Sequence, residues 1–437
     1  MSSSTGLGFD TVFDGSRLTS KDWNDAAGDP LKSFGYEYET SGLMSGDSVD
    51  ANERAFAWND NGALASVDQD PLAWDGRLLT STGVRDLAYD AATGRLSQAA
   101  KGSDTTSYQY DAQGNRTKSV DGSTETSYAW NGLNQLTKLD DTTFSYGADG
   151  IRTKVGSAVQ NYGQDLKLLS DGETKYLWAP NGSLLAQAPL NSNSEADTQQ
   201  AVTDALGSVH SVLDDQLSSV GEYSYTVFGE RTLTAGANVS SIGFASEQHD
   251  DSGLVYLRYR YLDPAVGQFI SVDPLVSMTL DPYGYADGNP LQMTDPLGLF
   301  SWGWEDTDNL TGGIGSVAGV IGLGATILAF TPIGAPIVGA LALAVTVTTV
   351  AGVVTSAYTA ARTCRSDQIP TPDCGGSVLG IGLGAVSFTK PLATSWKLAT
   401  SGDSTIRASH QAVQGVAGAL PLVNDFGNRA IKGAHTC

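Results

Sequence analysis

The stretches "AYDAATGRL" (Ala88–Leu96) and "QYDAQGNRT" (Gln109–Thr117) show the pattern that decides the fold. Each has an aromatic residue, then Asp, a few small or polar residues, Gly, and a Leu or Arg nearby. Looser versions keep this order, namely "AWNDNGAL" from Ala57, "AWDGRL" from Ala73, "AWNGLNQL" from Ala129 and "SYGADGIRT" from Ser145. The units start roughly fifteen to twenty residues apart. Self-similarity at such a period predicts a repeat architecture.

This period suits one β-hairpin per unit. The aromatic residue would lie on a strand, Asp or Asn with Gly would form the turn by tolerating positive φ, and the next strand would begin at the Leu or Arg. Intervening stretches such as "TETSYAW" alternate with the period of two that strands prefer. A β-sandwich with Gly turns is the alternative, but the matching register of the units favours a repeat. We therefore expect Tyr89, Tyr110 and Trp130 at equivalent places along a sheet.

The units resemble the YD repeats of the Rhs proteins, the C subunits of Tc toxins and the teneurins. The resemblance implies a long β-sheet that winds into a hollow shell, here over residues 1–200. Winding allows a repeat that cannot bury its own face to bury it against its neighbours. The expected fold is mainly β, a wound YD-repeat shell. Since so few units cannot close a large shell, a C-terminal fragment or a truncated member is expected.

The stretch "YLRYRYLDPAVGQFISVDP" (Tyr256–Pro274) follows the repeats. It resembles the Rhs-associated core, which we assign to residues 201–299. Its tyrosines are expected to alternate along a sheet. Arg258 and Arg260 are expected as partners of nearby carboxylates.

Two Asp-Pro segments follow in this core. Asp273-Pro274-Leu275-Val276 is separated by eighteen residues from Asp295-Pro296-Leu297-Gly298, and the chain continues Leu299-Phe300. This arrangement resembles the paired DPxG motif of Rhs proteins and Tc C subunits that cut themselves just after the final Leu. The resemblance implies that Asp273 and Asp295 are catalytic and that the bond from Leu299 to Phe300 is cut.

A pair of aspartates has a clear physical logic for this chemistry. Two carboxylates held close together cannot both ionise easily, so one stays protonated and polarises the scissile carbonyl while the other activates a water. Pro274 and Pro296 would fix the local turns. Gly298, which lacks a Cβ, would let the backbone pass close to both acids.

The first segment departs from the motif. Val276 stands where Gly is expected, and Val272 stands where the family often carries a basic or polar residue. The alternative is that both Asp-Pro pairs only form turns. Asp263-Pro264 and Asp281-Pro282 show that the pair also occurs elsewhere in this chain.

Residues 300–437 differ in composition from the rest of the chain. The run 309–361 contains no charged residue, and its apolar stretches 313–330 and 337–358 are each near the roughly 20 residues that span a bilayer. We expect a Gly- and Ala-rich α-helical segment with a membrane hairpin. The alternative is a soluble core hairpin enclosed by the shell. No metalloprotease, zinc-deaminase or Walker pattern occurs in this segment.

The overall charge and the start of the chain give further limits. The 25 basic and 48 acidic residues leave a net charge of −23, which argues against a nucleic-acid-binding surface. The first residues lack the basic and apolar regions of a cleavable secretion signal. His210 and His249 lie far from any set of metal ligands in the sequence, and we expect neither a metal nor a cofactor.

Our first hypothesis is the C-terminal portion of an Rhs polymorphic toxin that is secreted or lies at the cell surface. The shell would enclose the segment 300–437, and aspartyl autoproteolysis would release it as an effector with a membrane hairpin. The expected partners are an immunity protein, a secretion apparatus and a target membrane. A non-catalytic surface scaffold anchored by the hairpin and an inactive fragment are the alternatives. The mass of the expressed chain distinguishes them, because only the toxin is cut after Leu299.

Overall fold

The computed structural model describes residues 7–15, 17–163 and 165–303. The chain divides into two compact units, Met1–Glu305 and Asp306–Cys437, and the described residues belong to the first. The apolar stretches 313–330 and 337–358, for which a helical hairpin is expected, lie outside the described residues.

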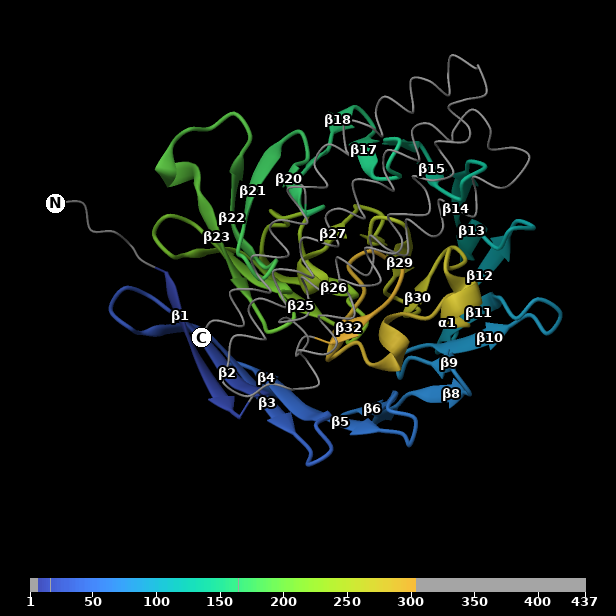
Figure 1. Ribbon diagram of the computed structural model, residues 1–437, viewed down its shortest axis with the longest axis horizontal. Helices are drawn as coiled ribbons and strands as arrows, with labels where there is room; N and C mark the ends of the chain where they lie inside the picture. The colour runs from blue at the N-terminus through green and yellow to red at the C-terminus, as the bar shows by residue number, and fades with distance from the viewer. Residues whose placement is uncertain (1–6, 16, 164, 304–437) are drawn as a thin grey trace, which may run out of the picture. The chain divides into compact units, whose positions relative to one another are not determined.

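Three antiparallel sheets, in which each strand pairs with the next in the chain, make up most of the described residues (Figure 1). The first sheet consists of β1 (Gly8–Asp14), β2 (Arg17–Asn24), β3 (Pro30–Tyr38), β4 (Met44–Val49), β5 (Asn52–Trp58), β6 (Leu64–Val67) and β7 (Asp70–Pro71). The second consists of β8 (Ala73–Asp75), β9 (Leu78–Ser81), β10 (Asp86–Tyr89), β11 (Leu96–Lys101), β12 (Asp104–Tyr110), β13 (Arg116–Asp121), β14 (Thr124–Trp130), β15 (Leu136–Leu139), β16 (Thr142–Tyr146), β17 (Arg152–Val155) and β18 (Ala158–Val159). The third consists of β19 (Asn161–Tyr162), β20 (Leu168–Ser170), β21 (Thr174–Trp178), β22 (Leu184–Pro189), β23 (Gln199–Thr203), β24 (Val209–Leu213), β25 (Ser219–Tyr225) and β26 (Arg231–Gly236), with the 3₁₀ turn Glu195–Asp197 before β23.

The aromatic residue of most repeats occupies the same place in its hairpin. It is the last residue of a strand, a register shift precedes it, and it lies opposite the Leu or Arg that begins the next strand. The pairs are Tyr89 with Leu96, Tyr110 with Arg116, and Trp130 with Leu136. The prediction that these three aromatic residues are equivalent is confirmed. Trp74 differs, since it lies one residue before the end of β8 and opposite Leu79, the second residue of β9.

Hydrogen bonds from the aromatic residues tie successive repeats together. The donor is the indole N–H or the phenol O–H, and the acceptor is the carbonyl of the Leu or Arg in the preceding unit. The bonds are Trp130 to Arg116 (2.7 Å), Tyr146 to Leu136 (2.7 Å) and Trp178 to Leu168 (2.7 Å). A buried Trp or Tyr usually needs such an acceptor, and here the backbone of the preceding repeat supplies it.

The turns differ in which residue adopts the left-handed conformation. Gly94 and Gly114 have φ values of 67° and 92°, as the repeat pattern predicts. In the unit "AWNGLNQL", however, Asn134 has the positive φ of 57°, and Gly132 is not among the positive-φ residues. Asn tolerates this conformation better than other residues with a Cβ, so it can replace Gly there.

Short elements form a core on the concave side of these sheets (Figure 1). They are the 3₁₀ turn Phe244–Ser246, β27 (Gln248–His249), β28 (Val255–Tyr256), β29 (Tyr261–Asp263), β30 (Gln268–Phe269), α1 (Val276–Thr279), the 3₁₀ turn Ala286–Gly288, β31 (Met293–Thr294) and β32 (Trp302–Gly303). Buried arginines of the repeats bind this core. Arg116 contacts Asp263 and Arg152 contacts Asp250, each at 2.6 Å. The inward repeat position therefore carries Arg where a core aspartate faces it.

Candidate active site

A tight turn at Leu257–Arg260, between β28 and β29, forms the base of the site. The amide of Leu257 donates a hydrogen bond to the carbonyl of Arg260 at 2.9 Å. Arg258, within the turn, has a φ of 66°. This left-handed conformation costs a residue with a Cβ about 1 to 2 kcal/mol, so it must be held by the contacts around it.

The turn binds three consecutive carbonyl oxygens of the segment that precedes Leu299. Each oxygen accepts a hydrogen bond from one of three consecutive turn residues. The pairs are the Pro296 oxygen with Nη1 of Arg258 (3.0 Å), the Leu297 oxygen with the amide of Tyr259 (3.1 Å), and the Gly298 oxygen with Nε of Arg260. The segment is therefore held through its backbone.

Gly298 fits against this turn only because it lacks a side chain. Its φ is 65°, and a Cβ built on it would lie 2.9 Å from the Leu257 carbonyl oxygen and 3.0 Å from the Arg260 amide nitrogen. Real Cβ atoms are rarely this close to backbone atoms. From the sequence, glycine at this position was expected to allow a close approach to the two acids. The structure gives a different reason, since the nearest atoms belong to the turn.

Asp295 contacts both residues of the bond that is expected to be cut. Its side chain is buried, and its Oδ1 accepts the amide N–H of Leu299 at 2.9 Å and that of Phe300 at 3.1 Å. Burial raises the pKa of this carboxyl above its usual value, although Arg260 and the two amides oppose the shift. A buried acid with a raised pKa can keep its proton at a pH where an exposed aspartate is ionised.

Asp273 is also buried and is held by its own turn. Its Oδ1 accepts the amide N–H of Leu275 at 2.7 Å, and its Oδ2 accepts the hydroxyl of Thr279, the last residue of α1, at 2.8 Å. The segment after Pro274 folds back through α1, which allows two acids twenty-two positions apart to approach the same group. Thr279 gave no signal in the sequence, because its role depends on this fold.

Arg260 connects the two aspartates. Its Nη1 lies 3.7 Å from Oδ2 of Asp273, and its Nη2 lies 3.2 Å from Oδ2 of Asp295. The guanidinium group stacks on the ring of Phe269 at 3.6 Å. Burial lowers the pKa of Arg260, and both carboxylates counteract that effect. The sequence predicted a carboxylate partner for Arg260 but not that it would contact both acids.

A cavity of about 360 Å³ reaches this site from the side of Asp273. Asp273 and Pro274 form part of its wall, and Trp130 and Tyr146 from the repeats and Tyr259 from the turn form another part. The volume is large enough for several waters. Asp273 therefore borders a space that can hold water, whereas Asp295 is not among the residues that line it.

The bond between Leu299 and Phe300 lies in the loop of a small hairpin. β31 and β32 pair antiparallel, with Thr294 opposite Trp302. Leu299 is 5% exposed, so its side chain is almost fully enclosed before the bond. Both ends of the segment are thus fixed, and the peptide bond is presented between them.

Both Asp-Pro pairs also begin turns. The amide of Val276 donates to the carbonyl of Asp273 at 3.0 Å, and the amide of Gly298 donates to the carbonyl of Asp295 at 3.1 Å. Pro274 and Pro296 occupy the second position of these turns, where proline fits well. Forming a turn and presenting a carboxylate to Arg260 are compatible roles for the same residue pair.

Comparison with known proteins identifies the relatives of this chain. It is 27% identical over 323 residues to the double-stranded DNA deaminase toxin A of Burkholderia cenocepacia, which covers 63% of this chain and 22% of that protein. It is 25% identical over 300 residues to the probable deoxyribonuclease RhsA of Dickeya dadantii, which covers 60% of this chain and 20% of that protein. The chain is an Rhs-type protein. The matched region of the Rhs-type protein spans about a fifth of the length of these two relatives.

The fold of the Rhs-type protein resembles a solved Tc toxin structure. The match to TcdB2-TccC3-TEV has a TM-score of 0.50 and 16% identity, and it covers 67% of this chain and 18% of that one. At this identity the match shows the fold alone, which is mainly β with open sheets that resemble those of the Tc toxin β-shell. No protein-family profile matches the chain.

Two findings about membranes and metals concern the part of the chain that the structure describes. No helix there has both the length and the apolar character needed to cross a membrane. No group of three or more His, Cys, Asp or Glu side chains there could hold a metal ion.

Proposed function

We propose that this Rhs-type protein is the C-terminal portion of a secreted polymorphic toxin and that its core cuts the chain between Leu299 and Phe300. One observation carries the proposal. Oδ1 of Asp295 lies 3.1 Å from the amide nitrogen of Phe300, which is the atom that leaves when this bond is hydrolysed. A catalytic acid must be within hydrogen-bonding distance of the atom that it protonates.

Asp295 acts as the acid in this mechanism. Burial raises its pKa and so favours the protonated form. As the bond between Leu299 and Phe300 breaks, Asp295 gives its proton to the nitrogen of Phe300, which becomes a free amine. The carboxylate that remains lies 3.2 Å from Nη2 of Arg260, which stabilises its new charge.

Asp273 acts as the base. A water from the adjoining cavity gives a proton to Asp273, and its oxygen bonds to the carbonyl carbon of Leu299. The products are a carboxyl group on Leu299 and an amine on Phe300, and one proton has moved onto Asp273 and one off Asp295. Arg260 keeps the two carboxyl groups at fixed positions throughout.

The test is the mass of the full chain, synthesised in a cell-free system and kept native at neutral pH. The wild type should split after Leu299, whereas Asp273→Asn and Asp295→Asn should each leave one uncut chain. Asp281→Asn is the matched control, because it alters another Asp-Pro pair of the same loop and should still be cut. A wild type that stays whole, or cutting after Leu299 in both Asn variants, contradicts the mechanism.

In this proposal the parts of the chain have separate roles. The shell over 1–200 and the core over 201–299 enclose the cargo and cut it free. The cargo is the segment 300–437, which is the effector. The uncharged run 309–361 within this segment supports a membrane hairpin, and a target membrane, an immunity protein and a secretion apparatus are the corresponding partners. The DNA-directed activities in the names of the two relatives are not extended to this segment, which lacks the zinc-deaminase pattern. Leakage of dye from liposomes exposed to the cut protein tests the membrane role.

A further inference from the structure

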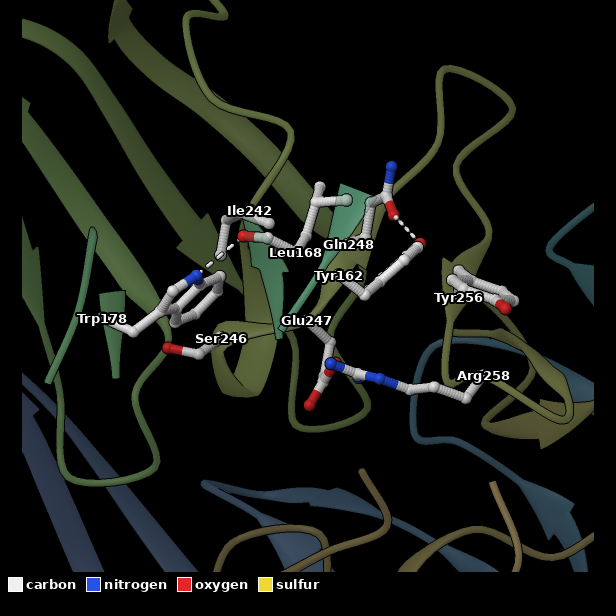
Figure 2. Close-up of a pocket in the computed structure, with 9 residues that line it drawn as sticks. All are labelled: Tyr162, Leu168, Trp178, Ile242, Ser246, Glu247, Gln248, Tyr256 and Arg258. Carbon is white, nitrogen blue, oxygen red and sulfur yellow. Dashed lines mark hydrogen bonds and ion pairs between the residues drawn. The ribbon is translucent and has the colours of Figure 1, made fainter. Parts of the chain in front are cut away.

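Arg258 joins three parts of the chain. Its Nη1 donates to the carbonyl of Pro296 at 3.0 Å, in the segment before the cut. Its Nε and Nη2 donate to the carbonyl of Leu166 at 3.1 and 2.9 Å, in the repeat loop before β20. It also forms an ion pair with Glu247 of the core (Figure 2). One side chain thus links the sheet, the core and the cleavage segment.

The surroundings of Arg258 leave its side chain little freedom. Arg258 is 6% exposed and Glu247 is 2% exposed. The cavity beside them, which Tyr162 and Trp178 help to line in Figure 2, measures about 10 Å³. That is room for about one water. A buried charge needs its partners, so Arg258 cannot leave Leu166 and Glu247 without a large loss of free energy.

Arg258 differs from Arg260 in what it contacts. Arg260 touches both Asp273 and Asp295. Within the described residues, the hydrogen bonds and ion pairs of Arg258 do not include either aspartate. The side chain of Arg258 reaches the cleavage segment through the backbone carbonyl of Pro296.

We propose that Arg258 is a positioning residue for the cleavage. It fixes Pro296, and through it the bond from Leu299 to Phe300, against Asp295. Because it also binds Leu166, this fixing requires that the repeat loop is already seated on the core. Cutting then follows the docking of the sheet. The inference rests on the proposed cleavage, and it specifies which contact sets the order of events.

The kinetic test follows cutting of the full chain over time after cell-free synthesis, from acidic to alkaline pH. Arg258→Met removes the hydrogen bonds to Pro296 and Leu166, and because a small misplacement of the reacting bond slows a reaction strongly, cutting should slow at least about tenfold. The pH at half-maximal rate should not change, and Arg258→Lys should restore part of the rate. Arg260→Gln should instead move this pH upward, because Arg260 opposes the raised pKa of Asp295.

Arg116→Met is the matched control. Arg116 is as buried as Arg258 and also pairs with a core carboxylate, Asp263, but its side chain lies in a different part of the core contact. The Arg116→Met chain should be cut at a rate within about threefold of the wild-type rate, since the mutation leaves the contacts of Pro296 in place. Equal slowing of both Met variants, or a changed pH profile for Arg258→Met, overturns the positioning role.

Hydrogen exchange decides the question without any cutting. In the Asp273→Asn chain, adding Arg258→Met should make the amides of Leu299 and Phe300 exchange at least about tenfold faster, while adding Arg116→Met should not. Should Arg258→Met fail to fold, Arg258→Lys is measured in its place and should show a smaller increase. Unchanged exchange refutes the inference. A third outcome separates the two proposals: Arg258→Met speeds exchange, but the wild-type chain is never cut. In that case Arg258 still positions the segment, and only the proposed cleavage is refuted.

Discussion

Gly298 and Val276 occupy matching positions in the two Asp-Pro segments, yet their backbones differ. Gly298 has a left-handed φ of 65° and lies against the Leu257–Arg260 turn. Val276 is the first residue of α1 and has helical geometry, which a residue with a Cβ adopts freely. The loss of glycine from the first segment therefore has no steric cost.

Substitution should slow cutting at Gly298 but leave it nearly unchanged at Val276. Gly298→Ala puts a Cβ within about 3 Å of the turn and forces a left-handed alanine, which costs about 1 to 2 kcal/mol from φ alone. We expect cutting to slow about tenfold or more. Val276→Gly should change the rate by less than about threefold, because the helical position tolerates either residue. Time courses of cutting at neutral pH measure both, and equal rates for the two variants would show that the fit of Gly298 does not matter.

In each repeat hairpin, the residue type can vary at the inward-facing position, which is the Leu or Arg that begins the second strand. Leu136, at this position, is fully buried in an apolar cluster, whereas Arg116 and Arg152 meet aspartates of the core. The backbone carbonyl at this position accepts the hydrogen bond of the next aromatic residue whichever side chain is present. The element therefore keeps its shape while the contact with the core changes from apolar to ionic.

Removing one of these aromatic hydrogen bonds should weaken the sheet by a small and definite amount. Trp130→Phe deletes the N–H that donates to the Arg116 carbonyl at 2.7 Å. The unpaired carbonyl and the lost bond should lower the free energy of unfolding by about 1 to 3 kcal/mol. Leu133→Ala is the control, since Leu133 is 78% exposed and its loss should cost less than about 0.5 kcal/mol. Urea unfolding of the two variants gives the comparison, and a loss no larger for Trp130→Phe would mean that this bond contributes nothing.

Local patterns in the sequence could predict the repeats but not the assembly of the site. The strands ending at Tyr89, Tyr110 and Trp130 follow from a pattern only a few residues long. The position of Arg260 between the acids depends on contacts 13 and 35 residues along the chain, and nothing near it in the sequence indicates them. The conformation of Arg258 is harder still to predict. Its left-handed φ is one that residues with a Cβ disfavour, and tertiary contacts hold it.

The described unit is held together by polar contacts between residues that are far apart in the chain. Lys21 donates to the hydroxyl of Thr203 at 3.1 Å, and Trp23 donates to the carbonyl of the same residue at 2.9 Å. The amide of Met44 donates to Oε1 of Gln292 at 3.1 Å. The first sheet is therefore bound both to the third sheet and to the segment between the two aspartates. Changes in the core should affect the stability of the whole unit.

Stability should fall in acid because of His249. Its Nε2 accepts the amide N–H of Phe244 at 3.0 Å, and burial lowers its pKa from 6.5 to about 3. The folded state then binds fewer protons than the unfolded state between these two values, so stability decreases as pH falls through that window. From pH 7 to pH 5 the loss should be about 2 kcal/mol. Urea unfolding at both pH values should show this decline in the free energy of unfolding of the wild type. For His249→Gln the decline should be smaller by about 2 kcal/mol. Parallel declines would mean that other groups cause it.

The backbone contacts of the cleavage segment have a consequence for how such genes change. The Leu257–Arg260 turn recognises carbonyl oxygens, and Asp295 recognises Phe300 by its amide hydrogen. Every amino acid except proline carries that hydrogen. If the proposed cleavage operates, recombination could replace everything encoded after Leu299 and keep the cutting machinery, as long as the new first residue is not proline and the residues after it still pair with β31. The upstream part would then serve as a reusable carrier for unrelated passengers, in nature or in the laboratory.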